Sequence, residues 1–168
     1  MPRYPIADAS PADARPGIET HPPHTVLVLG GGAMHGMAHI GVIRALVEAR
    51  VEIDAIVGTS IGALVGARWA TGASVEALEE DALSVTEPAV LKRNFKAFMI
   101  GGISQSAIYD GEHYRDLIQR LIAPATFASL VRPLRVNAMS LRNGDERWFG
   151  HGAERTLGLT DAVYASGA

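Results

Sequence analysis

The sequence of 168 residues contains no cysteine. Disulfide bonds, thiolate metal ligands and a cysteine nucleophile are therefore excluded. No stretch approaches the roughly 20 consecutive apolar residues of a transmembrane helix, and the first 25 residues lack the apolar run of a secretory signal. The net charge is −3, whereas an electrostatic nucleic-acid binder is expected to be basic. We therefore expect a soluble, cytoplasmic protein that does not bind nucleic acid.

Proline is concentrated at the amino terminus. Six of the nine prolines precede residue 25, among scattered Asp, Ala and Arg without periodicity. Because proline fixes φ and lacks a backbone donor, we interpret residues 1–24 as a disordered Pro-rich tail. The chain as a whole has 48% apolar and 20% charged residues, which is ordinary globular usage. Residues 25–168 are therefore interpreted as one domain, or part of one.

Short apolar runs and helical patterns alternate over residues 26–72. The run Val26-Leu27-Val28-Leu29 is typical of a buried parallel strand, and a helix is predicted from about residue 34 to 50. A second strand is predicted over 53–57 and a second helix over 61–70. This order indicates an α/β fold with a mostly parallel sheet and right-handed crossovers.

The remaining signals are softer. The patterns predict helices over 74–85, 88–99 and 112–122, strands over 134–141 and 146–149 with an Asn-Gly turn between them, and a helix that begins at residue 160. The last helix is still running at Ala168. We therefore expect the chain to stop before its domain is complete, with the C-terminal part absent.

The strongest chemical signal is Gly58-Thr59-Ser60-Ile61-Gly62, a GxSxG between a predicted strand and a predicted helix. A serine there lies on a sharp nucleophile elbow at the carboxyl edge of the sheet, and Gly58 and Gly62 permit the tight backbone. The following helix directs backbone N–H groups toward it. We predict that Ser60 is a nucleophile; the alternative is a packing turn whose serine only caps the helix.

A second glycine-rich loop, Gly30-Gly31-Gly32-Ala33, also joins a strand to a helix. Free N–H groups at such a junction bind anions, either a phosphate or the oxyanion of acyl transfer. A dinucleotide fingerprint would need glycine where His35 stands, and no Gly-Lys-Ser/Thr of a P-loop is present. Paired with GxSxG on the neighbouring strand, the loop favours an oxyanion hole.

The stretch VLVLGGGAMHGMAHIGVIRALVEARVEIDAIVGTSIGALVGARWATG resembles the amino-terminal half of a patatin-like phospholipase domain. TFASLVRPLRVNAMSLRNGDERWFG and LTDAVYASGA resemble later parts of that domain more loosely. The resemblance covers about residues 25–168 and implies a serine lipid acyl hydrolase with a three-layer α/β/α fold and a Ser–Asp dyad. It implies Ser60 as nucleophile and Gly31 and Gly32, with Gly30 or Ala33, as oxyanion-hole donors.

The chain departs from this family at three points. Ala33 stands where the family usually has glycine, and His35 where it has arginine or lysine, so a fixed cation is missing at neutral pH. The Asp-Gly-Gly or Asp-Gly-Ala motif that carries the catalytic aspartate is also missing. We do not transfer its role to any other aspartate, namely Asp54, Asp110, Asp145 or Asp161.

Histidine offers two other interpretations. His35 and His39 are four residues apart, a spacing that suits a metal ion, but no H-E-x-x-H pattern accompanies them. We predict a packing role for His39 and no metal site. A Ser-His-Asp triad of the α/β-hydrolase kind needs a histidine after Ser60, and only His113 and His151 follow it.

These observations predict hydrolysis of lipid or phospholipid carboxylic esters through an acyl-enzyme, without metal or cofactor. Membrane contact would be peripheral, and the apolar cluster formed by Phe95, Phe98, Met99 and Ile100 is a candidate acyl-chain surface. Because the aspartate is missing, we expect the 168-residue chain alone to have little activity. A second copy or a complementing C-terminal segment would be its partner. The alternative function is a non-catalytic lipid-binding or interaction module.

Overall fold

The computed structural model describes residues 25–85, 111–150 and 157–167. Five predictions therefore lie outside the described part: the Pro-rich tail, the helix over 88–99 with its apolar cluster, Asp110, the His113 side chain and His151.

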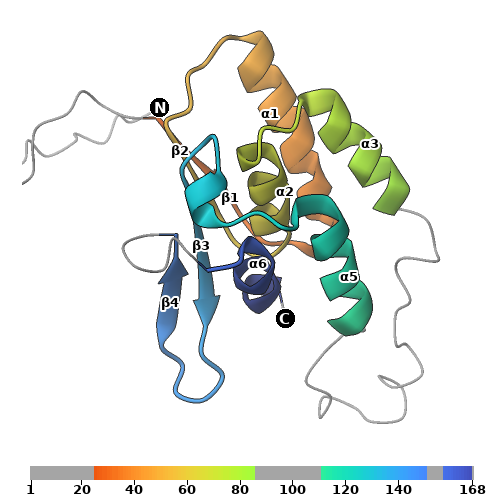
Figure 1. The fold of residues 1–168 in the computed structure, drawn as a ribbon. Coiled ribbons are helices and arrows are strands. Elements are labelled where there is room, and N and C mark those ends of the chain that lie inside the picture. Colours follow the sequence, from red (N-terminus) through yellow and green to blue (C-terminus); the bar gives the residue numbers. More distant parts are fainter. Residues whose placement is uncertain (1–24, 86–110, 151–156, 168) are drawn as a thin grey trace, which may run out of the picture.

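The described strands form one sheet in the order β1-β2-β3-β4 (Figure 1). Strands β1 (Val26–Leu29), β2 (Ala55–Gly58) and β3 (Leu134–Met139) are mutually parallel, and β4 (Glu146–Phe149) pairs antiparallel with β3. The predicted α/β fold with a mostly parallel sheet is therefore confirmed. Leu29, Gly58 and Val136 share one level of the sheet, because Leu29 pairs with Gly58 and Gly58 with Val136.

The hairpin of β3 and β4 is the one that the Asn143-Gly144 signal predicts. Gly144 has φ 74°, which glycine adopts without strain, and its N–H donates to the Ser140 carbonyl (2.8 Å). The Ser140 N–H in turn donates to the Asp145 carbonyl (2.8 Å). Strand β3 ends at Met139 rather than at residue 141, because the turn begins at Ser140.

The first helix is interrupted, in contrast to the continuous helix predicted over 34–50. A 3₁₀ segment, η2 (Ala33–Met37), precedes α1 (Ala38–Glu48). Its tight winding brings Gly36 against Ile61, where an added Cβ would lie 2.1 Å from Ile61 Cγ2. The segment therefore packs directly on the start of the next helix, which a regular helical pattern in the sequence does not indicate.

The other described α-helices lie close to their predicted positions. They are α2 (Ile61–Ala70), α3 (Val75–Val85), α5 (Gly111–Ile122) and α6 (Leu159–Gly167). A short 3₁₀ turn that was not predicted, η4 (Phe127–Ser129), follows α5. Ser74 caps α3 as expected, since its Oγ accepts the Ala77 N–H (3.2 Å). None of the helices in the described ranges has both the length and the apolarity needed to cross a bilayer.

The described helices cover one face of the sheet (Figure 1). Leu29, Ile56 and Val136 point to that face and are at most 1% exposed, whereas Val28 on the opposite face is 67% exposed. Consecutive parallel strands joined by right-handed crossovers place successive helices on the same side, which accounts for the asymmetry. The second helical layer of the expected three-layer fold is not among the described residues.

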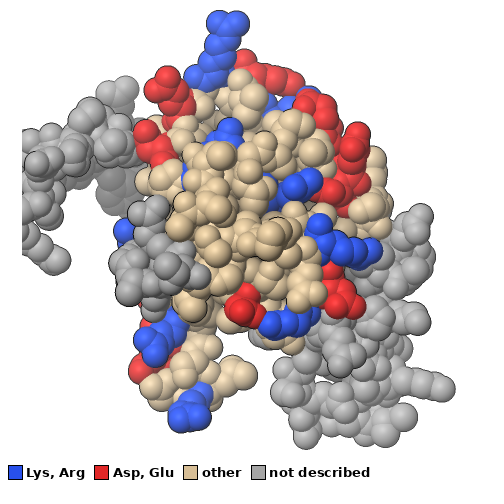
Figure 2. All heavy atoms as spheres, viewed as in Figure 1, with Lys and Arg blue, Asp and Glu red and all other residues tan. Residues whose placement is uncertain are grey.

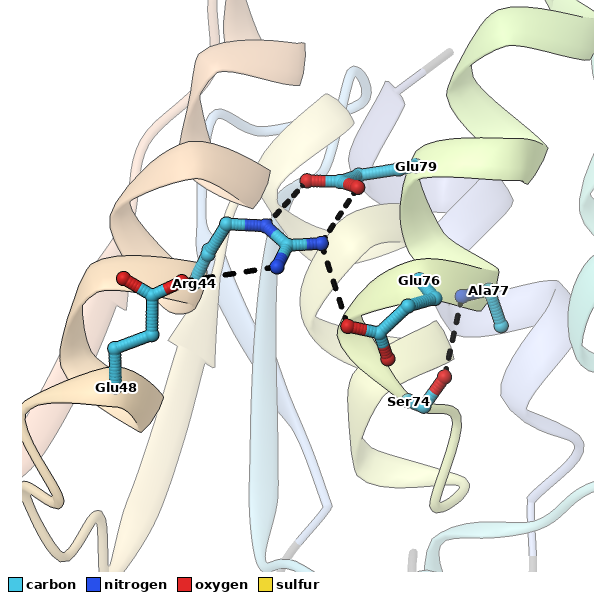
Figure 3. A network of polar contacts seen from close by, with 6 residues as sticks. All are labelled: Arg44, Glu48, Ser74, Glu76, Ala77 and Glu79. Carbon is cyan, nitrogen blue, oxygen red and sulfur yellow. Dashed lines mark hydrogen bonds and ion pairs between the residues drawn. The ribbon is translucent and has the colours of Figure 1, made fainter.

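Helices α1 and α3 are joined by an ion-pair cluster around Arg44 (Figure 3). The Arg44 guanidinium donates to both carboxylate oxygens of Glu79 (2.6 Å each) and to Glu76 (3.3 Å). Glu48, one turn along α1, lies 3.7 Å from the same guanidinium. The hydrogen bond from Arg44 is the largest cause of the lowered pKa of Glu79. The cluster fixes α3 beside α1 on the outside of the core.

Candidate active site

Ser60 occupies a strained turn between β2 and α2. Strand β2 ends at Gly58, α2 begins at Ile61, and Ser60 has φ 54° and ψ −123°. Few residues other than glycine adopt positive φ, and those that do are often found at functional sites. The structure therefore places Ser60, half-buried, at a sharp strand-to-helix elbow of the predicted kind.

Close packing requires the two glycines beside this elbow. A Cβ on Gly58 would lie 2.5 Å from Ala63 Cα, and a Cβ on Gly62 would lie 2.2 Å from the Leu29 carbonyl oxygen. Both contacts are with backbone, which cannot easily move away. The glycines therefore let α2 approach β1 and β2 closely enough to hold Ser60 at the edge of the sheet.

Thr59 makes hydrogen bonds to both strands that flank β2, namely β1 and β3. Its N–H donates to the Leu29 carbonyl of β1 (3.0 Å), and its hydroxyl donates to Oδ1 of Asn137 on β3 (2.7 Å). Asn137 is not among the residues predicted from the sequence, and it lies 78 positions from Thr59 in the chain. Its position one residue after Val136, level with the elbow, is visible only once the strand register is known.

The glycine-rich loop lies directly beside Ser60. A Cβ built on Gly31 would lie 3.5 Å from the Cβ of Ser60, an ordinary van der Waals contact. Within the described residues, the N–H groups of Gly30, Gly31 and Gly32 make no hydrogen bond. The loop turns through Gly32 (φ 151°) and Ala33 (φ 49°). The structure thus brings the two predicted loops together and leaves amide donors available next to the hydroxyl-bearing residue.

His39 of α1 makes a hydrogen bond to this loop. Its Nε2 lies 2.9 Å from the Gly30 carbonyl oxygen, which accepts a hydrogen bond from the ring. His39 therefore positions the loop, whereas His35 is exposed at its end. Within the described ranges, no group of three or more His, Asp or Glu side chains is arranged to hold a metal ion.

A small pocket of about 130 Å³ opens beside Ser60. Its lining is apolar except for Ser60 and Tyr114, and it includes Ala33 of the glycine loop; the other lining residues are Met34, Ile61, Val85, Leu117 and Gly167. Burial raises the pKa of Tyr114 to about 12, so its hydroxyl stays protonated at neutral pH. Tyr114 is not predicted from the sequence as part of the site, because the helical period over 112–122 indicates only an apolar core face.

Ser166 of α6 is a third residue near Ser60 that the sequence does not predict. Its Oγ accepts the Ser60 backbone N–H (2.8 Å), a contact between residues 106 positions apart. This amide is therefore occupied within the protein. The amides of the neighbouring glycine loop make no hydrogen bond with a described residue.

No described carboxylate or imidazole makes a hydrogen bond to the Ser60 hydroxyl. Asp54 accepts the Thr25 N–H at the opposite edge of the sheet (2.7 Å). Asp161 pairs with Arg115, and Asp145 is bound by the Asn143 amide in the hairpin turn. These three carboxylates are therefore engaged in contacts away from Ser60.

A parallel α/β sheet with a serine elbow beside a glycine-rich loop is an architecture that serine hydrolases use. The chain belongs to the patatin-like phospholipase family, whose family model matches residues 27–168.

Relatives support this membership. Over 130 residues the chain is 33% identical to uncharacterized NTE family proteins of Mycobacterium bovis and Mycobacterium tuberculosis, which covers 77% of this chain and 34% of each relative. A stretch of 49 residues is 61% identical to the lysophospholipase NTE1 of Coccidioides immitis, covering 29% of this chain and 3% of that protein. The chain therefore spans about a third, or less, of the length of these relatives.

Solved structures show the same fold. ExoU of the Pseudomonas aeruginosa type III secretion system, in its complex with SpcU, superimposes with a TM-score of 0.60 at 21% identity, over 87% of this chain and 38% of ExoU. A second ExoU structure gives a TM-score of 0.55 at 17% identity, over 87% of this chain and 40% of that one. The α/β patatin-like fold is therefore shared with these proteins.

Proposed function

We propose that this chain carries the nucleophile and oxyanion-hole part of a lipid acyl hydrolase that cleaves carboxylic esters of phospholipids or lysophospholipids. The observation that carries the proposal is the closeness of the glycine loop to Ser60: the Ser60 Cβ lies 3.5 Å from the place that a Cβ on Gly31 would take. A serine at positive φ and amide donors without a described partner therefore lie side by side. The family and the lysophospholipase relatives support the substrate class.

In the proposed mechanism, Ser60 Oγ attacks the ester carbonyl and loses its proton to a base. The carbonyl π electrons move to oxygen, and the glycine-loop amides stabilise the resulting oxyanion. The C–O bond to the leaving alcohol then breaks, and the alcohol takes up the proton. Water hydrolyses the acyl-enzyme by the same steps, releasing the fatty acid and restoring Ser60.

The glycine loop, rather than the Ser60 amide, supplies the oxyanion donors in this proposal. The Ser60 N–H is already bound to Ser166, whereas the amides of Gly30, Gly31 and Gly32 have no described partner. Removing one oxyanion donor typically costs about 3–4 kcal/mol of transition-state stabilisation. The hydrogen bond from His39 to the Gly30 carbonyl keeps the loop in place.

The base is the part of the proposal that the described residues do not supply. The family resemblance assigns it to an aspartate, and no described carboxylate contacts Ser60. An alcohol without a positioned base is a weak nucleophile. We therefore expect slow turnover of lipid esters by the 168-residue chain.

A fluorophosphonate probe tests the proposal, because it reads the reactivity of one serine and does not require turnover. Because no described base activates Ser60, we expect slow labelling of the wild-type chain and no labelling of the Ser60→Ala variant. Ser84→Ala is the matched control, since Ser84 is an exposed serine on α3 and its variant should label like the wild type. Peptide mapping by mass spectrometry identifies the labelled residue.

Absence of labelling on a folded wild-type chain would contradict the proposal. It would favour the alternative, a non-catalytic lipid-binding or interaction module. Labelling that persists in Ser60→Ala would place the reactive group elsewhere and would equally reject the assignment.

A further inference from the structure

The β3–β4 hairpin extends past the edge of the sheet that carries Ser60. Strand β2 ends at Gly58, which pairs with Val136, and β3 continues for three more residues to Met139. At about 3.3 Å per residue, Met139 lies about 10 Å beyond the end of β2. The turn after Met139 reaches further in the same direction, since β2 and β3 are parallel. The hairpin tip therefore projects from the side of the molecule on which the candidate active site lies (Figure 1).

Large apolar side chains are exposed on this projection. Leu141 at the tip is 95% exposed, Met139 is 68% exposed and Trp148 is 36% exposed. Asn137 pairs with Trp148, and strand side chains alternate, so Trp148 and Met139 lie on the same face of the hairpin. That face continues the sheet face on which the described helices do not pack. No packing requirement within the described residues accounts for an apolar residue as exposed as Leu141.

Free positive charge accompanies the apolar side chains. Arg142 and Arg147 are exposed and form no ion pair with a described residue. The hairpin's two acidic residues, Asp145 and Glu146, are exposed as well, and their carboxylates accept hydrogen bonds from the amides of Asn143 and Asn137 (3.4 Å for Glu146). Figure 2 shows the hairpin protruding from the body of the molecule, with basic and uncharged atoms at its far end.

We propose that the β3–β4 hairpin, residues 139–148, is a membrane-docking element that inserts Leu141 and Met139 into a bilayer and binds anionic headgroups through Arg142 and Arg147. Exposed aliphatic and tryptophan side chains beside arginine suit the boundary between headgroups and acyl chains. Docking through this tip turns the Ser60 edge of the sheet toward the lipid. The inference rests on the proposed function for its purpose, but the docking itself does not require catalysis.

Vesicle binding by the full 168-residue chain tests the proposal. We expect cosedimentation with vesicles of equimolar phosphatidylcholine and phosphatidylglycerol, and weaker binding to phosphatidylcholine alone. Leu141→Asp should lower the partition coefficient about tenfold, because a leucine is lost from the apolar phase. Val47→Asp is the matched control: Val47 is an exposed apolar residue at the end of α1, 46% exposed, and its variant should bind like the wild type.

A second pair of variants tests the charges. Arg142→Gln should lower binding to the anionic vesicles about fivefold, because a basic residue near such a surface contributes about 1 kcal/mol. Arg50→Gln removes an exposed arginine just after α1 and should have little effect. Added salt should weaken wild-type binding and reduce the difference between the two variants.

Tryptophan fluorescence reports whether the hairpin itself enters the bilayer. The sequence has two tryptophans, of which Trp69 is 4% exposed in the core and Trp148 lies on the hairpin. We expect a blue shift of the emission on vesicle binding, and its loss in Trp148→Phe. Circular dichroism confirms that each variant is folded.

Three outcomes would overturn the proposal: no binding to anionic vesicles, equal binding by the Leu141 and Val47 variants, or a concentration-dependent dimer in ultracentrifugation that Leu141→Asp abolishes. The last outcome would make a second copy the occupant of the surface. Ser60→Ala should bind vesicles like the wild type. Vesicle binding without fluorophosphonate labelling would therefore reject the proposed function alone, and labelling without vesicle binding would reject the docking element alone.

Discussion

Gly62 shows how one residue sets the position of the proposed nucleophile. Any side chain at this position would meet the carbonyl oxygens of Leu29 and Gly30, at 2.2 and 2.6 Å from its Cβ. Helix α2 would have to move away from β1, and Ser60 at its first turn would move with it. The same glycine therefore serves both stability and the geometry of the site.

We expect Gly62→Ala to lower the free energy of unfolding by about 3 kcal/mol, because the added methyl group overlaps backbone that cannot relax cheaply. Gly41→Ala is the matched control. Gly41 lies in α1 with nothing within 4 Å of an added Cβ, so alanine should raise the free energy by up to about 1 kcal/mol. Urea denaturation measures both, and equal effects of the two substitutions would contradict the packing argument.

Some residues of the candidate site can be predicted from the sequence and others cannot. Ser60 and its glycines stand within five positions of one another, so a local motif exposes them. Tyr114 and Ser166 come from helices far along the chain and meet Ser60 only in the folded protein. Neither carries a local signal, because an aromatic residue on a helix face indicates core and a serine near a helix end indicates nothing specific.

At the scale of elements, the Arg44 cluster determines how α3 lies against α1. Glu48 and Glu76 are exposed and Glu79 is half-buried. Because the contacts are ion pairs, their effect on stability depends on the charge state of the glutamates. The lowered pKa of Glu79 means that the folded protein favours the ionised carboxylate. The contribution is therefore full above the ordinary pKa of 4.5 and is lost as the pH falls through the lowered folded-state pKa.

We expect Arg44→Gln to lower the unfolding temperature at pH 7, and the difference from the wild type to shrink as the pH falls below 4.5 and Glu79 is protonated. High salt should also reduce it, since the cluster faces solvent. Arg142→Gln removes an equal charge from a residue without an ion pair in the described part and should change the unfolding temperature little at any pH. A difference that persists undiminished in acid would exclude the ion pairs as its cause.

Element boundaries were predicted best where the signal is local. The start of α2 after Ser60 and the hairpin at Asn143-Gly144 follow from turn chemistry, and both are confirmed. The prediction of one continuous helix over 34–50 was wrong, because the structure has the 3₁₀ segment η2 before α1. The 3₁₀ segment packs Gly36 on Ile61, a contact between two elements that hydrophobic periodicity does not record.

At the scale of the whole molecule, the sheet has a covered face and an uncovered face within the described residues. Side chains alternate along each strand, so neighbours in sequence experience opposite environments. Val136 on the covered face is fully buried, whereas Val28 on the other is 67% exposed. This asymmetry also leaves the apolar face of the β3–β4 hairpin open.

We expect Val136→Thr to lower the free energy of unfolding by about 1–3 kcal/mol, because the threonine hydroxyl would be buried without a hydrogen-bond partner. Val28→Thr makes the same chemical change on the uncovered face and should cost well under 1 kcal/mol, since threonine favours strands and the hydroxyl reaches water. Thermal and urea unfolding compare the pair. A large loss for Val28→Thr would show that this face is covered in solution.

Sequence alone determined the α/β class, the serine elbow and the glycine loop, because hydrophobic period and turn chemistry are properties of neighbouring residues. Tertiary structure decided which distant groups join them: Asn137 and Ser166 at the elbow, Tyr114 in the pocket, and the exposed hairpin at the same edge. Those placements depend on strand register and helix packing, which arise from contacts between residues far apart in the chain. The shared edge of parallel strands turns two local motifs into one candidate site.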